Sequence, residues 1–493
     1  MRNQALQQLL DEKMTRKKFL GLGAFAVASL VGGGALLRAL QIRADTATTA
    51  SMQPENATAS PQATVVNDST ASGGKAIKFG AVATMPPSTG NESLANRVVG
   101  PTSDAGVVKV KTRSSGTGAS GRVRLKIGTD QAVTQNIVYS APVAPSGLGD
   151  AMHTITGLTR GKTYYYRVQM NSTTDTRPVV GRIVVAPDTA TSFAFCFASC
   201  CNTFDHGVFE YIRNRNDPLF LHLGDLWYAD NTGQTIDNFR NRMNMQLNTD
   251  KQGALYATTA LSYTPSDHDA GMKNESVGAL DGPALALFNQ AYRENFATPL
   301  VQSTSGVHHT FVYGRVRFIV LDGRTFKSDP AATDNASKTM LGATQKQWLK
   351  DTITASAQKV LVIANDVPWA GPTQAGADHW SGYNTERVEI GNFINASGKK
   401  AVIIGGDMHA LAHSSSASYG RGIPNYQAAP LVNAASIKGA PWDALYPTTA
   451  GATVSQYGRV VVTDTGGSTI KLEFTGYSAE GVARISRTDT FTV

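Results

Sequence analysis

Cysteine is scarce in this chain of 493 residues, and that scarcity excludes a fold held together by disulfides. The three cysteines all lie within one short stretch, at Cys196, Cys200 and Cys201. With no cysteine elsewhere to pair with, they cannot join distant segments. The fold must therefore depend on its hydrophobic core. Cys200, which follows an apolar segment, is a candidate metal ligand.

The chain also lacks a strong excess of charge of either sign. Lysine and arginine total 45 and aspartate and glutamate 37, which gives a formal net charge of +8. This excess is small for the length and lies partly within residues 1–43, so we expect no nucleic-acid binding. The length predicts more than one domain and allows a large core. We expect a monomer.

The first 43 residues predict an export signal. A basic segment at 15–18 precedes a Gly/Ala/Leu run at 21–37, which is typical of a targeting segment. The pattern resembles a twin-arginine signal with Lys17 at the second arginine. Cleavage and retention as a membrane anchor both stay open, because no clear small-residue cleavage site follows. We expect an extracellular, cell-surface or periplasmic protein.

Two segments precede the main domain. Residues 44–76 have almost no large apolar side chains, so we expect a flexible linker. Residues 77–187 predict an all-β sandwich, because short alternating segments are separated by Gly, Ser and Pro. Residues 153–168 resemble the late strands of a fibronectin type III domain, an Ig-like module that we expect to have a structural role. The expected strands include 107–111, 122–127 and 164–168.

From residue 191 to residue 493 the pattern changes to apolar strands that end in polar residues and alternate with helical segments. This alternation predicts a layered α/β domain. We expect strands at 193–198, 219–223, 317–321, 360–364 and 401–404, and helices at 207–214 and 343–356. Ligands in such folds gather at the carboxyl ends of strands. The side chains at these strand ends predict a metal site. They are Cys200, Asp225, Asp322, Asp366, Asp407 and His409.

These side chains suit more than one kind of cation. Carboxylates suit hard cations, whereas softer or trivalent iron accepts thiolate, phenolate and imidazole. Asp225 can bridge two ions, and Tyr228 can return its phenolate to one of them if the chain turns. Asp407 and His409 lie two residues apart on an extended segment and point the same way. Asp267 supplies a further carboxylate.

The same segments resemble the motifs of the PhoD alkaline phosphatase family, within the metallophosphoesterases. In chain order they are F-A-S-C at 197–200, H-L-G-D-L-W-Y at 222–228, F-R-N-R at 239–242, S-D-H-D at 266–269, L-D-G-R at 321–324, L-G-A-T-Q-K-Q-W-L at 341–349, D-H-W-S-G-Y at 378–383 and G-D-M-H at 406–409. The resemblance implies a layered metallophosphoesterase sandwich of mixed sheets flanked by helices. It also implies an exported enzyme that hydrolyses phosphate monoesters, diesters or both.

The resemblance further implies a di- or trinuclear site with iron(III) and calcium. The iron side would be held by Cys200, Asp225, Tyr228 and His409. The calcium side would be held by Asp225, Asp407, Asp267 and Asn274. In this chain Ser266 replaces the first aspartate of the family's D-D-H motif, and Asn274 follows Lys273, which falls where relatives have asparagine.

The implied chemistry is an in-line displacement by a metal-bound hydroxide. His268 would donate a proton or a hydrogen bond to the leaving oxygen. Arg240 is a candidate phosphate clamp, because its guanidinium fork matches phosphate oxygens.

Three other interpretations stay open. A purple acid phosphatase shares the Gly-Asp-x-x-Tyr motif, but it would need aspartate in place of Cys200 and G-H-x-H at 406–409. Within the PhoD-like group, phosphodiesterase or phospholipase D activity is an alternative to monoesterase activity. A degenerate wall-associated binding module would bind no metal and turn over no aryl phosphate.

Overall fold

The structure is a computed structural model that describes residues 84–228, 235–270, 282–300, 306–439 and 441–493, with two short strands further towards the N-terminus. Those strands, β1 (Ala63–Asn67) and β2 (Lys75–Phe79), pair antiparallel where the linker was predicted. They belong to a unit that is separate from Thr84–Val493. The predicted export signal lies outside the described residues. Along the described part of the chain, no helix combines the length and apolar character needed to cross a bilayer.

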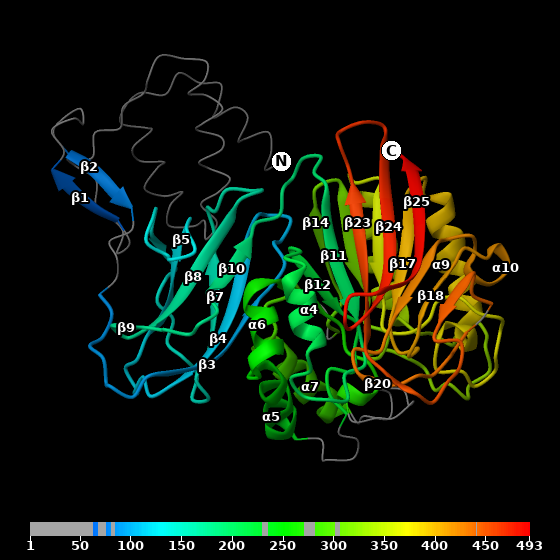
Figure 1. Cartoon of the computed structure of the whole chain (residues 1–493), viewed down its shortest axis with the longest axis horizontal. Coiled ribbons are helices and arrows are strands. Elements are labelled where there is room, and N and C mark those ends of the chain that lie inside the picture. The colour runs from blue at the N-terminus through cyan, green and yellow to red at the C-terminus, as the bar shows by residue number, and fades with distance from the viewer. Residues whose placement is uncertain are drawn as a thin grey trace, which may run out of the picture. The chain divides into compact units, whose positions relative to one another are not determined.

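Two antiparallel sheets form the first part of the larger unit (Figure 1). One has the order β3-β4-β7, and the other has the order β10-β8-β5-β6, with β9 beside β8. Val123, Leu125 and Ile127 alternate along β5 and are fully buried in a cluster that also holds Val108 and Val110 of the facing sheet. This is the sandwich that the alternating pattern predicts. Its strands are β3 (Ser93–Val99), β4 (Val108–Ser115), β5 (Val123–Gly128), β6 (Val138–Tyr139), β7 (Asp150–Ile155), β8 (Thr163–Met170), β9 (Thr173–Thr174) and β10 (Gly181–Val184).

Two large mixed sheets and one two-stranded sheet, β20-β22, form the sheets of the α/β part of the described chain. The first has the order β13-β12-β11-β23-β24-β25, which Figure 1 shows partly as the row from β11 to β25. The second has the order β14-β15-β16-β17-β19-β18-β21. The strands are β11 (Phe193–Ala198), β12 (Leu219–His222), β13 (Ala260–Tyr263), β14 (His309–Tyr313), β15 (Val316–Val320), β16 (Val360–Ala364), β17 (Lys400–Gly405), β18 (Leu411–Ser414), β19 (Asn425–Ala428), β20 (Asn433–Ala434), β21 (Ala444–Tyr446), β22 (Thr453–Val454), β23 (Gln456–Thr463), β24 (Thr469–Ser478) and β25 (Ala483–Thr492).

Strand β15 shows why the sheets are layered. Phe318 packs edge to face against Phe195 of the first sheet, at 5.1 Å between ring centroids. The next residue, Ile319, belongs instead to a cluster with Leu349 of α8 (Gly342–Ala355) and Ile390 of α9 (Asn384–Ala396). Successive side chains of a strand point to opposite faces, so a strand that is apolar on both faces needs a cover on each. The second sheet is therefore buried between the first sheet and these helices.

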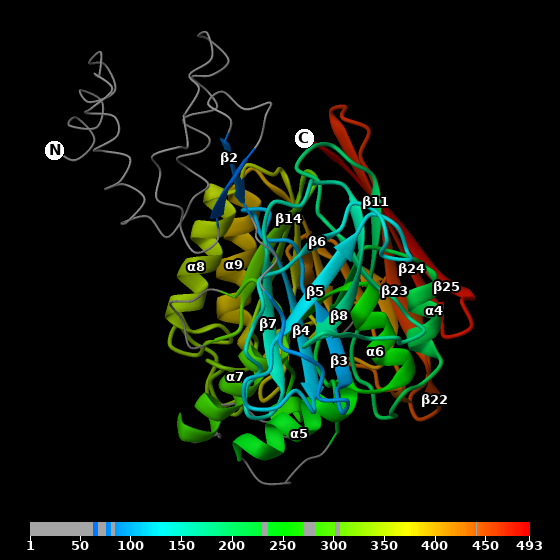
Figure 2. The same cartoon turned by 90° about the vertical axis from the view of Figure 1, so that its left-hand side faces the viewer.

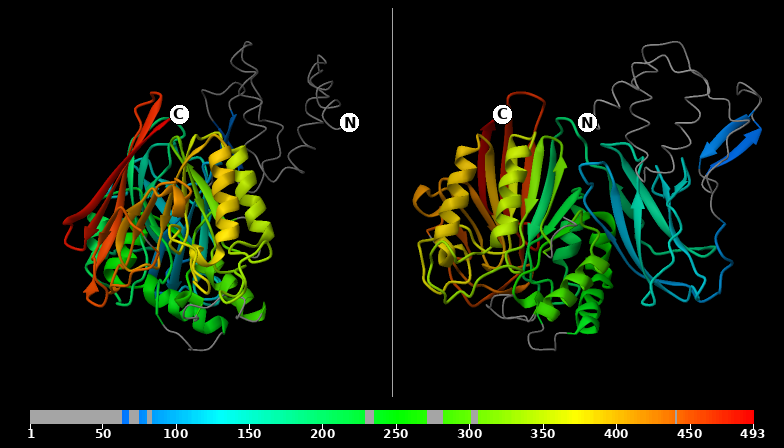
Figure 3. Two further views of the ribbon diagram at one scale, coloured as in Figure 1. Left: turned by 90° about the vertical axis from the view of Figure 1, so that its right-hand side faces the viewer. Right: turned by 180° about the vertical axis from the view of Figure 1, so that it is seen from behind.

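Helices cover the outer faces of both sheets. Figure 2 and the left panel of Figure 3 show α8 and α9 side by side, with the red strands β23 to β25 on the opposite side. Helices α4 (Val208–Asn214) and α6 (Asp250–Thr258) pack on the first sheet through Phe209 and Tyr256, which lie in one cluster with Phe220 of β12. The remaining described helices are α5 (Ile236–Leu247), α7 (Gly282–Asn295) and α10 (Ala417–Gly420), with short 3-10 turns at His268–Ala270 and Trp380–Tyr383.

The predicted elements of the α/β part are confirmed. Strands β11 and β16 coincide with the predicted 193–198 and 360–364, and the other predicted strands and helices differ by a residue at one or both ends. The fold class predicted for the chain is therefore confirmed. No element was predicted beyond residue 409, where β18, β19, β21 and β23 to β25 complete the two sheets and β20 pairs with β22.

Candidate metal centre

Three candidate ligands follow strands and share an unusual backbone conformation. Cys200, Asp225 and Asp407 come after β11, β12 and β17, with φ angles of 64°, 52° and 62°. Non-glycine residues rarely occupy this left-handed region, and each such residue costs about 1–3 kcal/mol. Hydrogen bonds hold these turns, since Cys200 N donates to Gly224 O at 3.0 Å and Asp407 N donates to Ser199 Oγ at 3.0 Å. The surrounding structure thus maintains three strained residues at one edge of the sheets.

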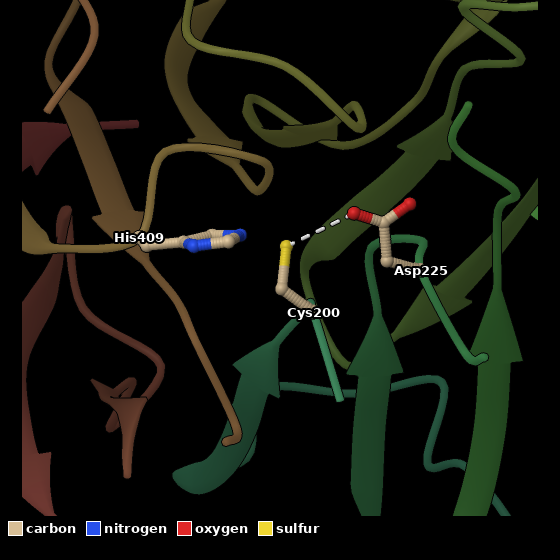
Figure 4. A group of neighbouring side chains, drawn as sticks. All are labelled: Cys200, Asp225 and His409. Carbon is tan, nitrogen blue, oxygen red and sulfur yellow. Dashed lines mark hydrogen bonds between the residues drawn. The ribbon is translucent and has the colours of Figure 1, made fainter. Parts of the chain in front are cut away.

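The first donor set consists of Cys200, Asp225 and His409, whose ligand atoms all lie within 4.8 Å of one another (Figure 4). Cys200 Sγ lies 3.3 Å from Asp225 Oδ2. His409 Nδ1 lies 2.6 Å from Ala434 O. Because a carbonyl oxygen can only accept, Nδ1 carries the proton and the lone pair of Nε2 is available to a cation.

Tyr228 completes this set. Its Oη donates to Asp225 Oδ2 at 3.0 Å and lies 3.3 Å from His409 Nε2. The chain therefore turns after β12 as the Tyr228 hypothesis requires. Thiol, phenol, imidazole and carboxylate converge here, which is the mixture that softer or trivalent iron accepts.

The second donor set consists of Asp225, Asp267 and His268, again with ligand atoms within 4.8 Å of one another. His268 N donates to Asp225 Oδ1 at 3.3 Å, and His268 Nε2 lies 3.9 Å from Asp267 Oδ2. The His268 ring also packs against the Tyr228 ring, with centroids 4.1 Å apart. Asp225 belongs to both sets, so one carboxylate connects two places where a cation fits.

The electrostatics of the cluster indicate what it would bind. Burial raises the pKa of the Cys200 thiol well above its usual value, and the nearby carboxylates of Asp225 and Asp407 add to the effect. Burial and Asp267, Asp269 and Asp407 likewise raise the pKa of Asp225. These groups cannot all ionise beside one another unless a positive charge joins them. A bound cation supplies that charge, so the donor set fits a metal centre.

Asp407 lies next to a lysine that the sequence analysis did not identify. Lys438 Nζ is 3.0 Å from Asp407 Oδ1 and 2.9 Å from Asp407 Oδ2, and 3.6 Å from Asp378 Oδ2. Burial opposes the charge on Lys438, but the two carboxylates outweigh it and raise the pKa of the ammonium. Lys438 lies on a loop between β20 and β21, and no local pattern marks it.

Arg324 is the centre of a buried network of ion pairs and hydrogen bonds that includes Asp267. Its side chain is 1% exposed, and Nε donates to Asp366 Oδ2 at 2.5 Å. Another guanidinium nitrogen donates to Ser266 Oγ at 2.9 Å and lies 3.4 Å from Asp267 Oδ1. Ser266 Oγ also donates to Asp366 Oδ2 at 3.1 Å. Asp366, one of the strand-end carboxylates, is therefore the partner of Arg324, and Ser266 belongs to the same network.

Asp269 positions the loops that carry the ligands. Its Oδ2 accepts from the backbone N–H groups of Asp225 and Ser266, each at 2.8 Å, and its Oδ1 accepts from Leu226 N at 2.7 Å. It follows His268 in the S-D-H-D segment, but only the folded chain shows that it connects that segment to the Asp225 turn. Asp269 thus fixes the directions in which the neighbouring side chains point.

Three predicted residues lie elsewhere or outside the described structure. Arg240, the predicted phosphate clamp, donates from two guanidinium nitrogens to the two carboxylate oxygens of Glu294, at 2.7 Å each. Asp322 accepts from Thr325 N at 2.9 Å and from Thr325 Oγ1 at 2.6 Å, so it holds its own loop. Asn274 is outside the described residues. The geometry thus brings together Cys200, Asp225, Tyr228, Asp267, His268, Asp407 and His409.

Mixed sheets in layers, with one aspartate shared by two donor sets at the carboxyl ends of the strands, agree with the predicted metallophosphoesterase fold. Residues 193–435 match the model of the family described as PhoD-like phosphatase. This match agrees with the resemblance that the sequence motifs predicted.

Three relatives illustrate the likeness. The chain is 26% identical over 346 residues to alkaline phosphatase D of Bacillus subtilis (strain 168), and the match covers 58% of this chain and 58% of the relative's length. The solved structure of PhoD has a TM-score of 0.64 and 21% identity, covering 81% of this chain and 90% of that one. Purple acid phosphatase PPD1 from yellow lupin (Lupinus luteus) seeds has a TM-score of 0.57 and 12% identity, covering 80% of this chain and 74% of that one. The structural likenesses concern the fold.

Proposed function

We propose that this protein is a metal-dependent phosphoesterase that hydrolyses a phosphate ester at two cations joined by Asp225. The observation that carries the proposal is the membership of Asp225 in both donor sets. The family match supports it independently. Two cations that share a carboxylate would suit an in-line displacement at phosphorus, because each could hold oxygens on the reacting phosphate.

We propose iron(III) for the Cys200 side and calcium for the Asp267 side. The support is donor chemistry, since thiolate, phenolate and imidazole suit iron and carboxylate oxygens suit calcium. Asp407, whose side chain is 6% exposed and lies beside Lys438, would add an oxygen donor on the calcium side. When bound, these cations would neutralise the phosphoryl oxygens and lower the pKa of a water molecule.

His268 would serve the leaving group and not the second cation, because calcium prefers oxygen ligands. Its backbone N–H is tied to Asp225, and its ring is held between Asp267 and the Tyr228 ring, with 13% of the side chain exposed. This places an imidazole at the accessible edge of the donor sets, within reach of an ester oxygen. From there it can donate a proton or a hydrogen bond to the leaving alcohol. The Arg324 network would keep Asp267 in place during the reaction.

The test is hydrolysis by the metal-loaded protein of a phosphate monoester and a diester that share one aryl leaving group. Asp225→Asn and His268→Ala are each expected to lower kcat by at least about 100-fold, the usual contribution of such groups. Asp351→Asn, on the exposed face of α8, is the matched control and should leave kcat unchanged. Full activity of both site variants would overturn the proposal.

Elemental analysis of the same protein distinguishes the alternatives. Iron with calcium supports the assignment above, whereas iron with zinc or manganese favours a purple-acid-phosphatase-like centre. Absence of both metal and turnover would favour a binding module. The ratio of monoester to diester rates decides between phosphatase and phosphodiesterase activity.

Export is proposed on the sequence alone. Its support is the basic segment at 15–18 and the apolar run at 21–37. Fractionation of cells that produce the full chain should find it outside the cytoplasm, and Arg16→Gln with Lys17→Gln should retain it inside. Equal distribution of the two proteins would contradict the proposal.

A further inference from the structure

A pocket lies beside the metal centre and shares Tyr228 with it. Its volume is about 230 Å³, and its lining includes Phe204 and Trp227, and Arg242 and Met245 of α5. The lining residues come from the segments that follow β11 and β12 and from α5, so three parts of the chain form one hollow. None of these residues belongs to the donor sets except Tyr228, which forms the boundary between the pocket and the site.

The pocket exposes apolar surface. Phe204 is 55% exposed and Met245 is 56% exposed, and both line this hollow together with Trp227, which is 3% exposed. A single exposed apolar side chain needs no explanation. Two exposed apolar side chains from different segments, lining one pocket beside a candidate active site, indicate a binding surface. Covering apolar surface with a ligand contributes about 25 cal/mol of free energy per Å² removed from water.

Tyr228 connects the pocket to His268. His268, the proposed partner of the leaving oxygen, packs its ring 4.1 Å from the Tyr228 ring. Tyr228 in turn lines the pocket. An alcohol whose oxygen is beside His268 can therefore pass along Tyr228 and place its organic part between Phe204 and Met245.

We propose that this hollow is a leaving-group pocket, which binds an apolar ring carried by the leaving alcohol. This inference rests on the proposed function. The volume is below the roughly 300–1,000 Å³ of sites that enclose a whole small molecule, so the pocket takes one ring and leaves the phosphate to the metal centre. Arg242 adds a guanidinium to the lining, and guanidinium groups stack favourably on aromatic faces. Aryl and arylalkyl phosphates are then better substrates than small alkyl phosphates.

The test compares benzyl phosphate with methyl phosphate, whose leaving alcohols are similarly acidic, so that the two esters differ mainly in the ring. Phe204→Ala and Met245→Ala are each expected to raise KM for benzyl phosphate about tenfold, in line with the loss of an apolar contact, and to leave KM for methyl phosphate unchanged. Phe204→Leu should restore part of the affinity. Tyr211→Ala, which removes an exposed aromatic side chain of α4 outside the lining, is the control.

If the variants change KM equally for both esters, or change it for neither, the leaving-group pocket is refuted. The proposed function is unaffected by either outcome. If the wild-type protein hydrolyses neither of these monoesters nor the aryl diester of the preceding section, the proposed function fails, and ligand binding then tests the pocket separately. In that case calorimetry compares 2-phenylethylphosphonate with ethylphosphonate, in which a methylene group replaces the ester oxygen. A preference for the phenyl compound that Phe204→Ala abolishes supports the pocket, and equal affinities overturn it.

Discussion

Ligation of iron by Tyr228, as proposed above, would be visible in an absorption spectrum. Without a cation, burial and the neighbouring Asp225 raise the pKa of its phenol well above the usual value. A ferric ion reverses this preference and holds the phenolate. Iron-loaded protein is therefore expected to show a visible charge-transfer band, and Tyr228→Phe should remove it. Absorption spectra at equal iron content make the measurement, with Tyr211→Phe as control. A colourless, iron-replete wild type would exclude Tyr228 as a ligand.

Asp269 provides a residue-scale test that does not alter a ligand. Its carboxylate accepts from the backbone of Asp225, Leu226 and Ser266. An asparagine side chain in its place would direct amide hydrogens at one or more of these N–H groups, so the Asp225 turn should shift. We expect Asp269→Asn to weaken metal affinity about 10–100-fold, as for other residues that orient ligands. Chelator competition measures this affinity, and an unchanged value would contradict the expected role.

At the scale of elements, Arg240 connects two helices. Its bidentate pair with Glu294 joins α5 to α7, and the two side chains are 20% and 28% exposed. A pair so exposed contributes about 1 kcal/mol or less. We expect Arg240→Gln to lower the free energy of unfolding by that amount and to leave KM unchanged. A phosphate clamp, as the sequence predicted, would instead raise KM. Adding Glu294→Gln should cause little further loss of stability if the pair is the cause.

Lys111 of β4 makes the contact between the sandwich and α7 dependent on pH. Its ammonium is fully buried and reaches Asp150 Oδ1 at 2.9 Å and Asn295 Oδ1 at 2.9 Å. Burial lowers the pKa of Lys111 from 10.5 to about 8, in spite of the Asp150 carboxylate. Between these values the unfolded chain binds a proton that the folded chain has released. The free energy of unfolding therefore rises with pH in this window, by at most about 1.4 kcal/mol per unit.

Lys111→Met removes that titration. Urea unfolding of both proteins at pH 8 and pH 10.5 should show the wild type gaining stability relative to the variant as the pH rises. Comparison with the variant cancels the contributions of other groups that titrate in this range. A difference that stays constant with pH would contradict the assignment.

At the scale of the whole described unit, Arg182 joins the sandwich to the α/β part. This guanidinium of β10 is largely buried and donates to Thr258 O at 2.8 Å, Asp217 O at 3.0 Å and Asn216 O at 3.2 Å. Arg182→Leu would leave buried carbonyl groups unpaired, which costs about 1–3 kcal/mol for each group. We expect a loss of about 3 kcal/mol in the free energy of unfolding by urea. Arg484→Leu, at an exposed position of β25, should cost far less.

Local pattern was sufficient for the elements, and it named most of the side chains that the structure brings together in the candidate site. Apolar segments of strand length ending in Cys200, Asp225 and Asp407 predicted the strands, and the order of the motifs predicted the family resemblance. These features could be inferred because strand periodicity, and the ligands that follow a strand, depend on residues that are adjacent in the sequence. The strands beyond residue 409 escaped prediction, although β24 alternates buried and partly exposed residues along its length.

The partners of charged side chains could be identified only in the folded chain. Lys438 on Asp407, Arg324 on Asp366 and Glu294 on Arg240 each join residues far apart in the sequence, and no local motif marks such pairs. Whether an arginine faces a phosphate or a neighbouring carboxylate depends on which charge lies nearer in space. The same holds for Tyr228. The sequence shows only that it lies three residues after Asp225, whereas the tertiary structure places it between the candidate metal centre and the proposed leaving-group pocket.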